Sequence, residues 1–246
     1  MNGLATLFYF PKFTPADEVA VLSRITETFS MFIGHYGAGL SFKKAAPPIS
    51  LGLLFIAVQF LDLLWPTFLL LHIEHVEIST DKGHPIPLIF TDYPWSHSLL
   101  MALVWSALFF GLYGLVTKNV RYALVLGLAV FSHWVLDFVV HVPDLPLYPG
   151  SSIKLGLQLW RYPVVANIVE GLIFFIGLFL YLKATKPRNR TGVVVFWLLV
   201  ALLLISDIAN LFSPPPPSVD AIAWAGQAMW LFVVLGFWAD KNRVAR

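Results

Sequence analysis

The sequence predicts an all-α integral membrane protein, a polytopic helix bundle with about seven membrane helices (six to seven). Hydrophobic residues make up 58% of the 246 residues and charged residues only 12%, roughly half the charged share of a soluble domain. Several apolar segments are long enough to cross the hydrocarbon core, which takes about 20 residues. Most prolines fall between these segments, where they cannot break a helix.

The predicted spans follow one another through short loops. The first helix is expected to start after an N-cap at Thr14, and only its second half, residues 29–42, is cleanly apolar. Pro66 is expected to kink the second span. The later spans cover residues 49–73, 95–116, 122–142, 164–182, 192–212 and 219–238.

We expect the whole chain, residues 1–246, to form a single membrane domain, since no internal repeat or linker is visible. Its predicted parts are an N-terminal interfacial segment with the outer part of the first helix (1–28), the half that carries the candidate site (29–142) and three further helices (164–238). The lipid bilayer is the expected partner. The net charge of +2 and the absence of a basic, aromatic-rich patch argue against a nucleic-acid partner.

Charge also predicts the orientation of the chain. Eleven lysines and arginines, Lys43 and Arg246 among them, lie in one alternate set of loops and chain ends, against four in the other. Basic loops stay in the cytoplasm, so we expect a cytoplasmic C-terminus, with the long loops 74–94 and 143–163 facing outward.

His133 and Asp137 lie four residues apart inside an apolar span, on one face of the predicted helix. Ionisable residues are costly in lipid and mark functional sites there. His35, Asp62 and His97 lie in other apolar segments. Imidazoles and carboxylates from several helices are a ligand set for zinc, manganese or iron. Without cysteine, thiolate ligands are excluded.

Depth estimates allow these side chains to meet. At 1.5 Å per residue, His133 lies about 12 Å, Asp137 about 6 Å and Asp62 about 16 Å below the outer ends of their helices. Asn167, Glu170, Asp207 and Asn210 share the outer half of the bilayer. A one-sided polar cluster of this kind predicts a cavity that opens outward.

Simpler interpretations stay open for single residues. A lone membrane histidine more often makes a hydrogen bond between helices than a metal bond. His141, at the helix rim, is a candidate catalytic residue but is equally compatible with solvation. Ser96 and His97 are adjacent, and adjacent helical residues diverge by about 100°, which disfavours a serine–histidine pair. Gly37 and Gly39 favour close helix packing over phosphate binding.

In this order, the motifs resemble the YdjM-like family of bacterial inner-membrane proteins, described as membrane-bound metal-dependent hydrolases. The family shows a histidine followed by glycine, an Asp-rich stretch, a "THS"-like histidine and a His-x-x-x-Asp helix. The counterparts here are His35-Tyr-Gly-Ala-Gly39, Gln59-Phe-Leu-Asp62, Ser96-His97-Ser98 and His133-Trp-Val-Leu-Asp137. The similarity covers roughly residues 30–142. Gln59 stands where a second acid is expected, and Tyr93-Pro94-Trp95 replaces an expected arginine.

The resemblance implies a hydrolase of the bacterial inner membrane that holds one or two divalent transition-metal ions, zinc in the first place. More distantly, the motif order is similar to zinc-dependent phospholipase C and to single-strand zinc nucleases, which cleave phosphodiesters. The resemblance to the YdjM-like family implies that His35, Asp62, His97 and His133 are metal ligands. Asp137 would be a further ligand or the general base. The expected substrate is then a phosphoester, such as a phospholipid, cleaved by metal-activated water.

Two other functions fit the same residues. In a transporter or permease the cluster would bind an ion or relay protons, and broken helices with inverted repeats would be expected. In a non-catalytic scaffold the metal would only stabilise the bundle.

Overall fold

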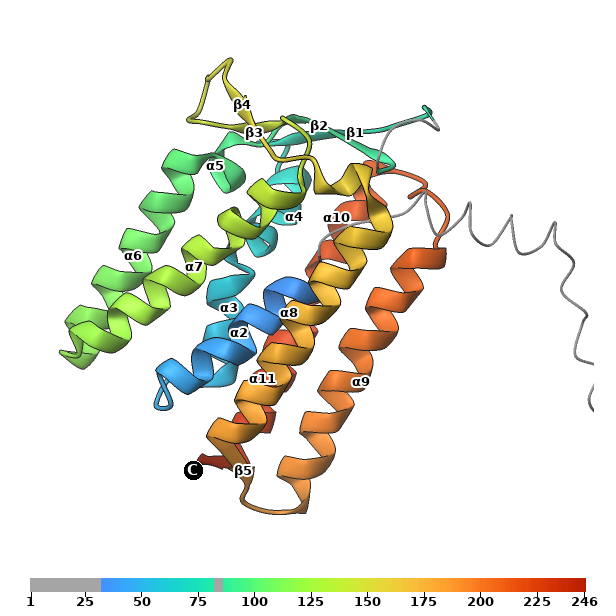
Figure 1. The fold of residues 1–246 in the computed structure, drawn as a ribbon. Coiled ribbons are helices and arrows are strands. Elements are labelled where there is room, and N and C mark those ends of the chain that lie inside the picture. Colours follow the sequence, from blue (N-terminus) through green and yellow to red (C-terminus); the bar gives the residue numbers. More distant parts are fainter. Residues whose placement is uncertain (1–31, 82–85) are drawn as a thin grey trace, which may run out of the picture.

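The computed structural model describes residues 32–81 and 86–246, so the predicted interfacial segment 1–28 lies outside the described residues. It confirms an all-α membrane bundle (Figure 1). Five helices in this part are long and apolar enough to cross a membrane, and a bent pair supplies a sixth span. The five are α6 (Leu99–Thr117), α7 (Val120–Val140), α8 (Pro163–Ala184), α9 (Arg190–Phe212), and α10 (Val219–Gln227) continued by α11 (Met229–Lys241).

Side-chain caps set the starts of several helices. Ser98 accepts from the Met101 N–H at the start of α6, and Asn119 accepts from the Tyr122 N–H at the start of α7. The cap at Ser98 divides the predicted span 95–116, because α5 (Pro94–His97) ends just before it. His97 is thereby placed at a break between helices, where its ring can turn inward.

The predicted span 49–73 consists of α3 (Leu51–Val58) and α4 (Phe60–Leu70), which meet at an angle of 60°. The bend lies at Gln59, and not at Pro66, which sits inside α4. Since α3 ends at Val58, the carbonyl of Val58 has no partner inside its own helix and is available to a side chain.

The first described helix, α2 (Ile33–Ala45), has 13 residues and is too short to cross the bilayer alone. It corresponds to the apolar half-helix predicted at residues 29–42. It packs closely on α8: a Cβ at Gly177 would collide with the carbonyl of Gly37. Gly37 therefore serves close helix packing, as expected for small residues in membrane helices.

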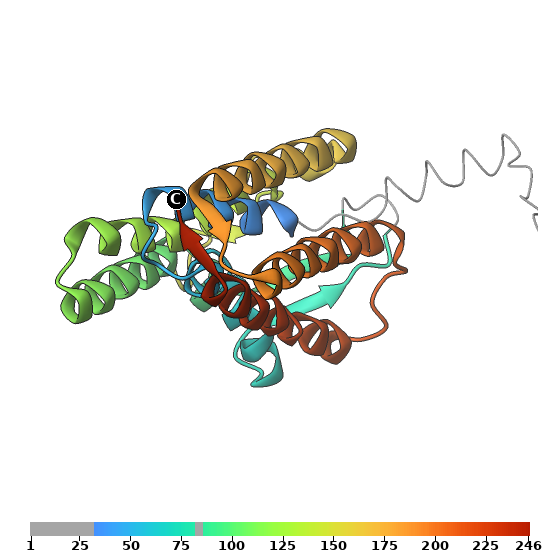
Figure 2. The same cartoon turned by 90° about the horizontal axis from the view of Figure 1, so that it is seen from below.

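The loops gather at the two ends of the bundle (Figures 1 and 2). One end carries α5, the 3-10 helix η1 (Leu159–Arg161) and two hairpins, β1 (His75–Ile78) with β2 (Leu88–Asp92) and β3 (Leu145–Pro146) with β4 (Lys154–Leu155). At the other end, β5 (Thr185–Pro187) pairs with β6 (Arg243–Ala245) beside the C-terminus. The Lys43 ammonium, 2.6 Å from the Asp240 carboxylate, also belongs to this second end.

Two apolar cores hold the helices together. One joins α2, α3, α4, α8, α9 and α11, and the other joins α3, α4, α6 and α7. Outside them, the bundle exposes large apolar side chains, and in α6 Ala102 is the one buried residue. An apolar exterior on helices of this length is what a bilayer requires.

Candidate metal centre

The structure brings together the five residues predicted as metal ligands. His35 comes from α2, Asp62 from α4, His97 from α5, and His133 and Asp137 from successive turns of α7. All are buried except Asp62, whose side chain is 24% exposed. Residues that are 102 positions apart at the extremes thus share one small volume, between the two apolar cores.

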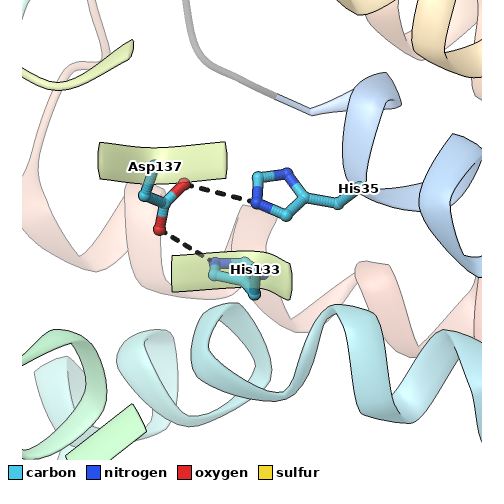
Figure 3. Close-up of side chains that lie close together, drawn as sticks. All are labelled: His35, His133 and Asp137. Atoms are coloured by element: carbon cyan, nitrogen blue, oxygen red, sulfur yellow. Dashed lines mark ion pairs between the residues drawn. The ribbon is translucent and has the colours of Figure 1, made fainter. Parts of the chain in front are cut away.

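Asp137 lies at the centre of the cluster. Its Oδ1 is 3.3 Å from His35 Nε2, and its Oδ2 is 3.1 Å from His133 Nε2 (Figure 3). Oδ2 also lies 3.6 Å from His97 Nε2. The rings of His35 and His133 lie against each other, with centroids 3.9 Å apart.

Asp62 completes the set from the opposite helix. Its Oδ1 is 3.3 Å from His97 Nε2 and 3.6 Å from His133 Nε2. The cluster therefore contains two carboxylates and three imidazoles.

The ring of His133 is oriented by the break in the second span. Its Nδ1 lies 2.7 Å from the Val58 carbonyl, which the end of α3 has left available. A carbonyl can only accept, so Nδ1 carries the proton and a neutral ring presents the lone pair of Nε2 to the cluster. Metal-bound histidines are typically held this way through their second nitrogen.

His97 is oriented by a longer chain of hydrogen bonds. Its Nδ1 lies 2.7 Å from Ser96 Oγ, and Ser96 Oγ donates to Glu74 Oε2 at 2.6 Å. The Glu74 carboxyl group also accepts the Trp95 and Ser96 N–H groups at the start of α5. Burial raises the pKa of Glu74, and these hydrogen bonds oppose that shift. Since Ser96 gives its single hydroxyl proton to Glu74, its oxygen can only accept from His97, so Nδ1 donates and Nε2 faces the carboxylates.

The adjacent pair Ser96–His97 was expected to be awkward on a continuous helix, and that expectation is wrong. Both residues belong to the four-residue helix α5, and Ser96 Oγ nevertheless lies within hydrogen-bond distance of His97 Nδ1, at 2.7 Å. Glu74 was not predicted from the sequence. It lies 22 residues before Ser96 in a loop, and no local pattern connects the two.

Several nitrogen and oxygen atoms that face one another in the cluster form no hydrogen bond. His133 Nε2, Asp137 Oδ2 and both ring nitrogens of His35 have no hydrogen-bond partner among the described residues, although the first two are 3.1 Å apart. Buried polar atoms are rarely left unpaired. Lone pairs that converge on a shared space are costly unless a proton or a metal ion lies between them.

The spacing of these atoms suits a small divalent cation. Two ligands placed 2.0–2.1 Å from zinc at tetrahedral angles are about 3.4 Å apart. The four His–Asp distances among Asp62, His97, His133 and Asp137 lie between 3.1 and 3.6 Å. Two overlapping groups could hold an ion: His35, His133 and Asp137, and Asp62, His97 and His133. Since His133 Nε2 has one lone pair, it serves one ion at a time.

His141 lies one helical turn beyond Asp137. It is buried rather than solvated, and its ring packs against Trp160 with the two ring centroids 4.1 Å apart. Its Nδ1 is 2.9 Å from Asp144 Oδ1, which also accepts the hydroxyl of Tyr93 at 2.8 Å. Burial and the nearby Asp144 raise the pKa of Tyr93 well above its usual value, so Tyr93 keeps its proton and donates it to Asp144.

A cavity of about 710 Å³ opens next to the cluster. Asp62, His97, Asp137 and His141 line one part of it, and side chains from α9, α10 and α11 line the rest. Of the four polar residues that predicted an outward cavity, Asn210 lines this one, whereas Asn167, Glu170 and Asp207 do not.

Glu170 has a different role from the cluster. Its carboxylate accepts the N–H groups of Phe32 and Ile33 at 3.2 Å, so it caps the start of α2. A carboxylate at a helix N-terminus is favourable because it meets unpaired N–H groups and the positive end of the helix dipole.

If the hydrogen-bond chain orients His97, Ser96→Ala should weaken metal binding by about 10- to 100-fold, as loss of such outer partners does elsewhere. Zinc affinity measured by competition with a chelator checks this. The matched control is Ser106→Ala, since the Ser106 hydroxyl bonds to the Ala102 carbonyl within α6. Equal affinities for the two variants would remove Ser96 and Glu74 from the account.

Helical spans, an apolar exterior and a buried polar cluster define the class: an integral membrane protein with an internal site that could hold a metal ion. A family model described as YdjM inner membrane protein matches residues 82–212, just over half of the chain. The chain belongs to this family of inner membrane proteins. Curated proteins and solved structures gave no match.

The matched region adds to the motif comparison. It contains His97, His133, Asp137 and His141, and it continues through α8 and α9, where the sequence showed no recognisable motif. His35 and Asp62 precede it. Their link to the cluster rests on the geometry of the fold.

Proposed function

We propose that this protein is a membrane-embedded, metal-dependent hydrolase that cleaves a phosphoester. The observation that supports this most is the convergence of unpaired histidine nitrogens and carboxylate oxygens, His133 Nε2 and Asp137 Oδ2 above all, beside an open cavity. Buried and unpaired groups of this kind lower stability unless they bind something, and they lie where a ligand can reach them.

His35, Asp62, His97 and His133 would hold the ion, with zinc as the first choice for this nitrogen and oxygen donor set. A bound divalent ion would supply positive charge for the phosphoryl oxygens and lower the pKa of a water molecule towards 7. Asp137 would act as a further ligand or, through Oδ2, as the acceptor of the proton that water loses.

His141 would donate the proton that the leaving oxygen of the substrate needs. Asp144 holds its Nδ1, so Nε2 is the nitrogen left for the cavity, which His141 lines. From there it can donate a proton to the leaving oxygen of a phosphoester. Tyr93, by donating to the same Asp144 oxygen, fixes that carboxylate and hence the orientation of the imidazole.

The site would face the outer side of the membrane. The cluster lies towards the end that carries α5 and the hairpins β1–β2 and β3–β4, whereas the basic loops and C-terminus lie at the opposite end (Figure 1). By the positive-inside rule, the C-terminal end is cytoplasmic.

Cysteine labelling checks this orientation. In intact cells, Asp81→Cys and Lys154→Cys should react with a membrane-impermeant thiol reagent, and Lys186→Cys and Arg246→Cys should react only after lysis. The parent chain has no cysteine and is its own blank. The reversed pattern would place the site on the cytoplasmic side.

One observation favours a second function, a transporter. The span formed by α3 and α4 is broken at Gln59, close to the cluster, and broken membrane helices are typical of ion and substrate sites in transporters. In that case the cluster would bind the transported ion or relay protons.

A single set of assays separates the two. Purified protein loaded with zinc or manganese should hydrolyse the soluble reporter bis(p-nitrophenyl) phosphate, and the same protein in liposomes should show no metal or proton flux. Flux without hydrolysis of any phosphoester would support the transporter. Metal binding with neither activity would leave a metal-stabilised scaffold.

A further inference from the structure

We propose that the substrate is an amphiphile, a phosphoester that carries a long apolar chain, and that the chain lies in the cavity between the cluster and α9–α11. This inference rests on the proposed hydrolase function and names its substrate class. It follows from three properties of the cavity wall: its position, its depth and its distribution of charge.

The cavity joins the cluster directly to the membrane helices. Its other walls include Ser206 and Asn210, one turn apart on α9, Ser213 just after that helix, and residues of α10–α11 from Ala221 to Phe232. A ligand whose phosphate is at Asp62 and Asp137 would therefore extend between transmembrane helices.

The wall also reaches deep into the bilayer. Val219 begins α10 at the outer end, and Phe232 lies 13 residues further, about 20 Å along the helix. The hydrocarbon core is about 30 Å thick, so a stretch of helix this long corresponds to more than half of that thickness. A volume of about 710 Å³ lies within the usual range for sites that enclose a small organic ligand.

Charge is confined to the cluster end of the cavity. The titratable side chains of the described lining are Asp62, His97, Asp137 and His141, and no lysine or arginine joins them. Most of the remaining lining is apolar, with Phe32, Ile222 and Met229 as examples. A divalent ion held by the cluster would neutralise a phosphate at that end alone, and the apolar walls favour hydrocarbon over water.

A chromogenic series with increasing chain length tests this proposal: p-nitrophenyl alkyl phosphates with butyl, octyl and dodecyl chains. In dilute detergent, kcat/KM should rise by about 100-fold or more from butyl to dodecyl, because each buried methylene adds to binding. Ala225→Trp, in the cavity wall on α10, should lower the dodecyl rate about tenfold more than it lowers the butyl rate.

The matched control is Ala209→Trp. Ala209 is exposed on α9 and does not line the cavity, so both rates should stay unchanged. Equal rates for all chain lengths, or a loss with Ala225→Trp that is the same for butyl and dodecyl, would overturn the amphiphile proposal and leave the hydrolase standing.

Binding provides a readout that does not need turnover. Native mass spectrometry of Asp137→Asn should show retained dodecyl phosphate, and the double variant with Ala225→Trp should lose it. Retention without hydrolysis by the parent protein would overturn the hydrolase but keep the chain site. If dodecyl phosphate is not retained and the rates do not depend on chain length, the proposal is overturned. A photo-crosslink from p-benzoylphenylalanine at position 225 to residues 1–31 would also overturn it, because a segment of the protein would then take the place of the alkyl chain.

Discussion

His133→Ala is expected to strip the purified protein of most of its bound metal, from one or two equivalents to less than about a tenth. His133 Nε2 belongs to both groups that could hold an ion, so its loss damages either arrangement. The remaining imidazoles cannot take its place, because His35 and His97 come from other helices. Elemental analysis by mass spectrometry of protein purified without added metal gives the result.

His75→Ala is the matched control for this experiment. His75 lies on β1 with its side chain 59% exposed, 3.9 Å from Asp92, outside the cluster. Its loss should leave the metal content unchanged. A parent protein that binds no zinc, manganese or iron would show that the cluster is a hydrogen-bonded ion-pair network, with protons on the histidines, and would end the hydrolase proposal.

Asp137→Asn is expected to reduce hydrolysis by about 100-fold or more while the protein still folds. The amide keeps the shape and one acceptor oxygen, but it removes the negative charge that faces His35, His97 and His133. Turnover of the soluble reporter and the thermal unfolding midpoint should be measured together, so that lost chemistry is separated from lost structure.

Asp220→Asn provides the comparison, since Asp220 is exposed in the first turn of α10. A small effect of Asp137→Asn, equal to that of Asp220→Asn, would assign Asp137 a structural role, because an amide can bond to the same neighbours. If the parent protein instead moves ions in liposomes and Asp137→Asn abolishes that flux, the transporter is the correct interpretation.

The sequence was sufficient for the membrane bundle and for the identity of the cluster. Apolar length located the spans to within a few residues, and ionisable residues inside such spans are rare enough to be informative. Helical spacing placed His133 and Asp137 on one face. The metal-binding role of these residues stays a prediction until metal is measured.

Other features depend on tertiary contacts that no local pattern encodes. The sequence predicts a kink at Pro66, because proline has a recognisable effect on helices and glutamine does not. The structure instead bends this span at Gln59. Glu74 and Asp144 lie in loops, and no sequence motif marks either of them. Their hydrogen bonds to Ser96 and His141 arise because the outer loops fold back over the ends of α5 and α7.

The origin of the cluster in four helices bears on how the protein is assembled. During synthesis, His35 enters the membrane about one hundred residues before Asp137, so the site cannot exist until α7 has been inserted. An ion captured at that moment would fasten helices from both apolar cores and would bind the folded chain in preference to the unfolded one. Cells starved of the metal should therefore accumulate less of the protein, because quality control degrades incompletely assembled bundles. This loss of protein is separate from any loss of catalytic activity.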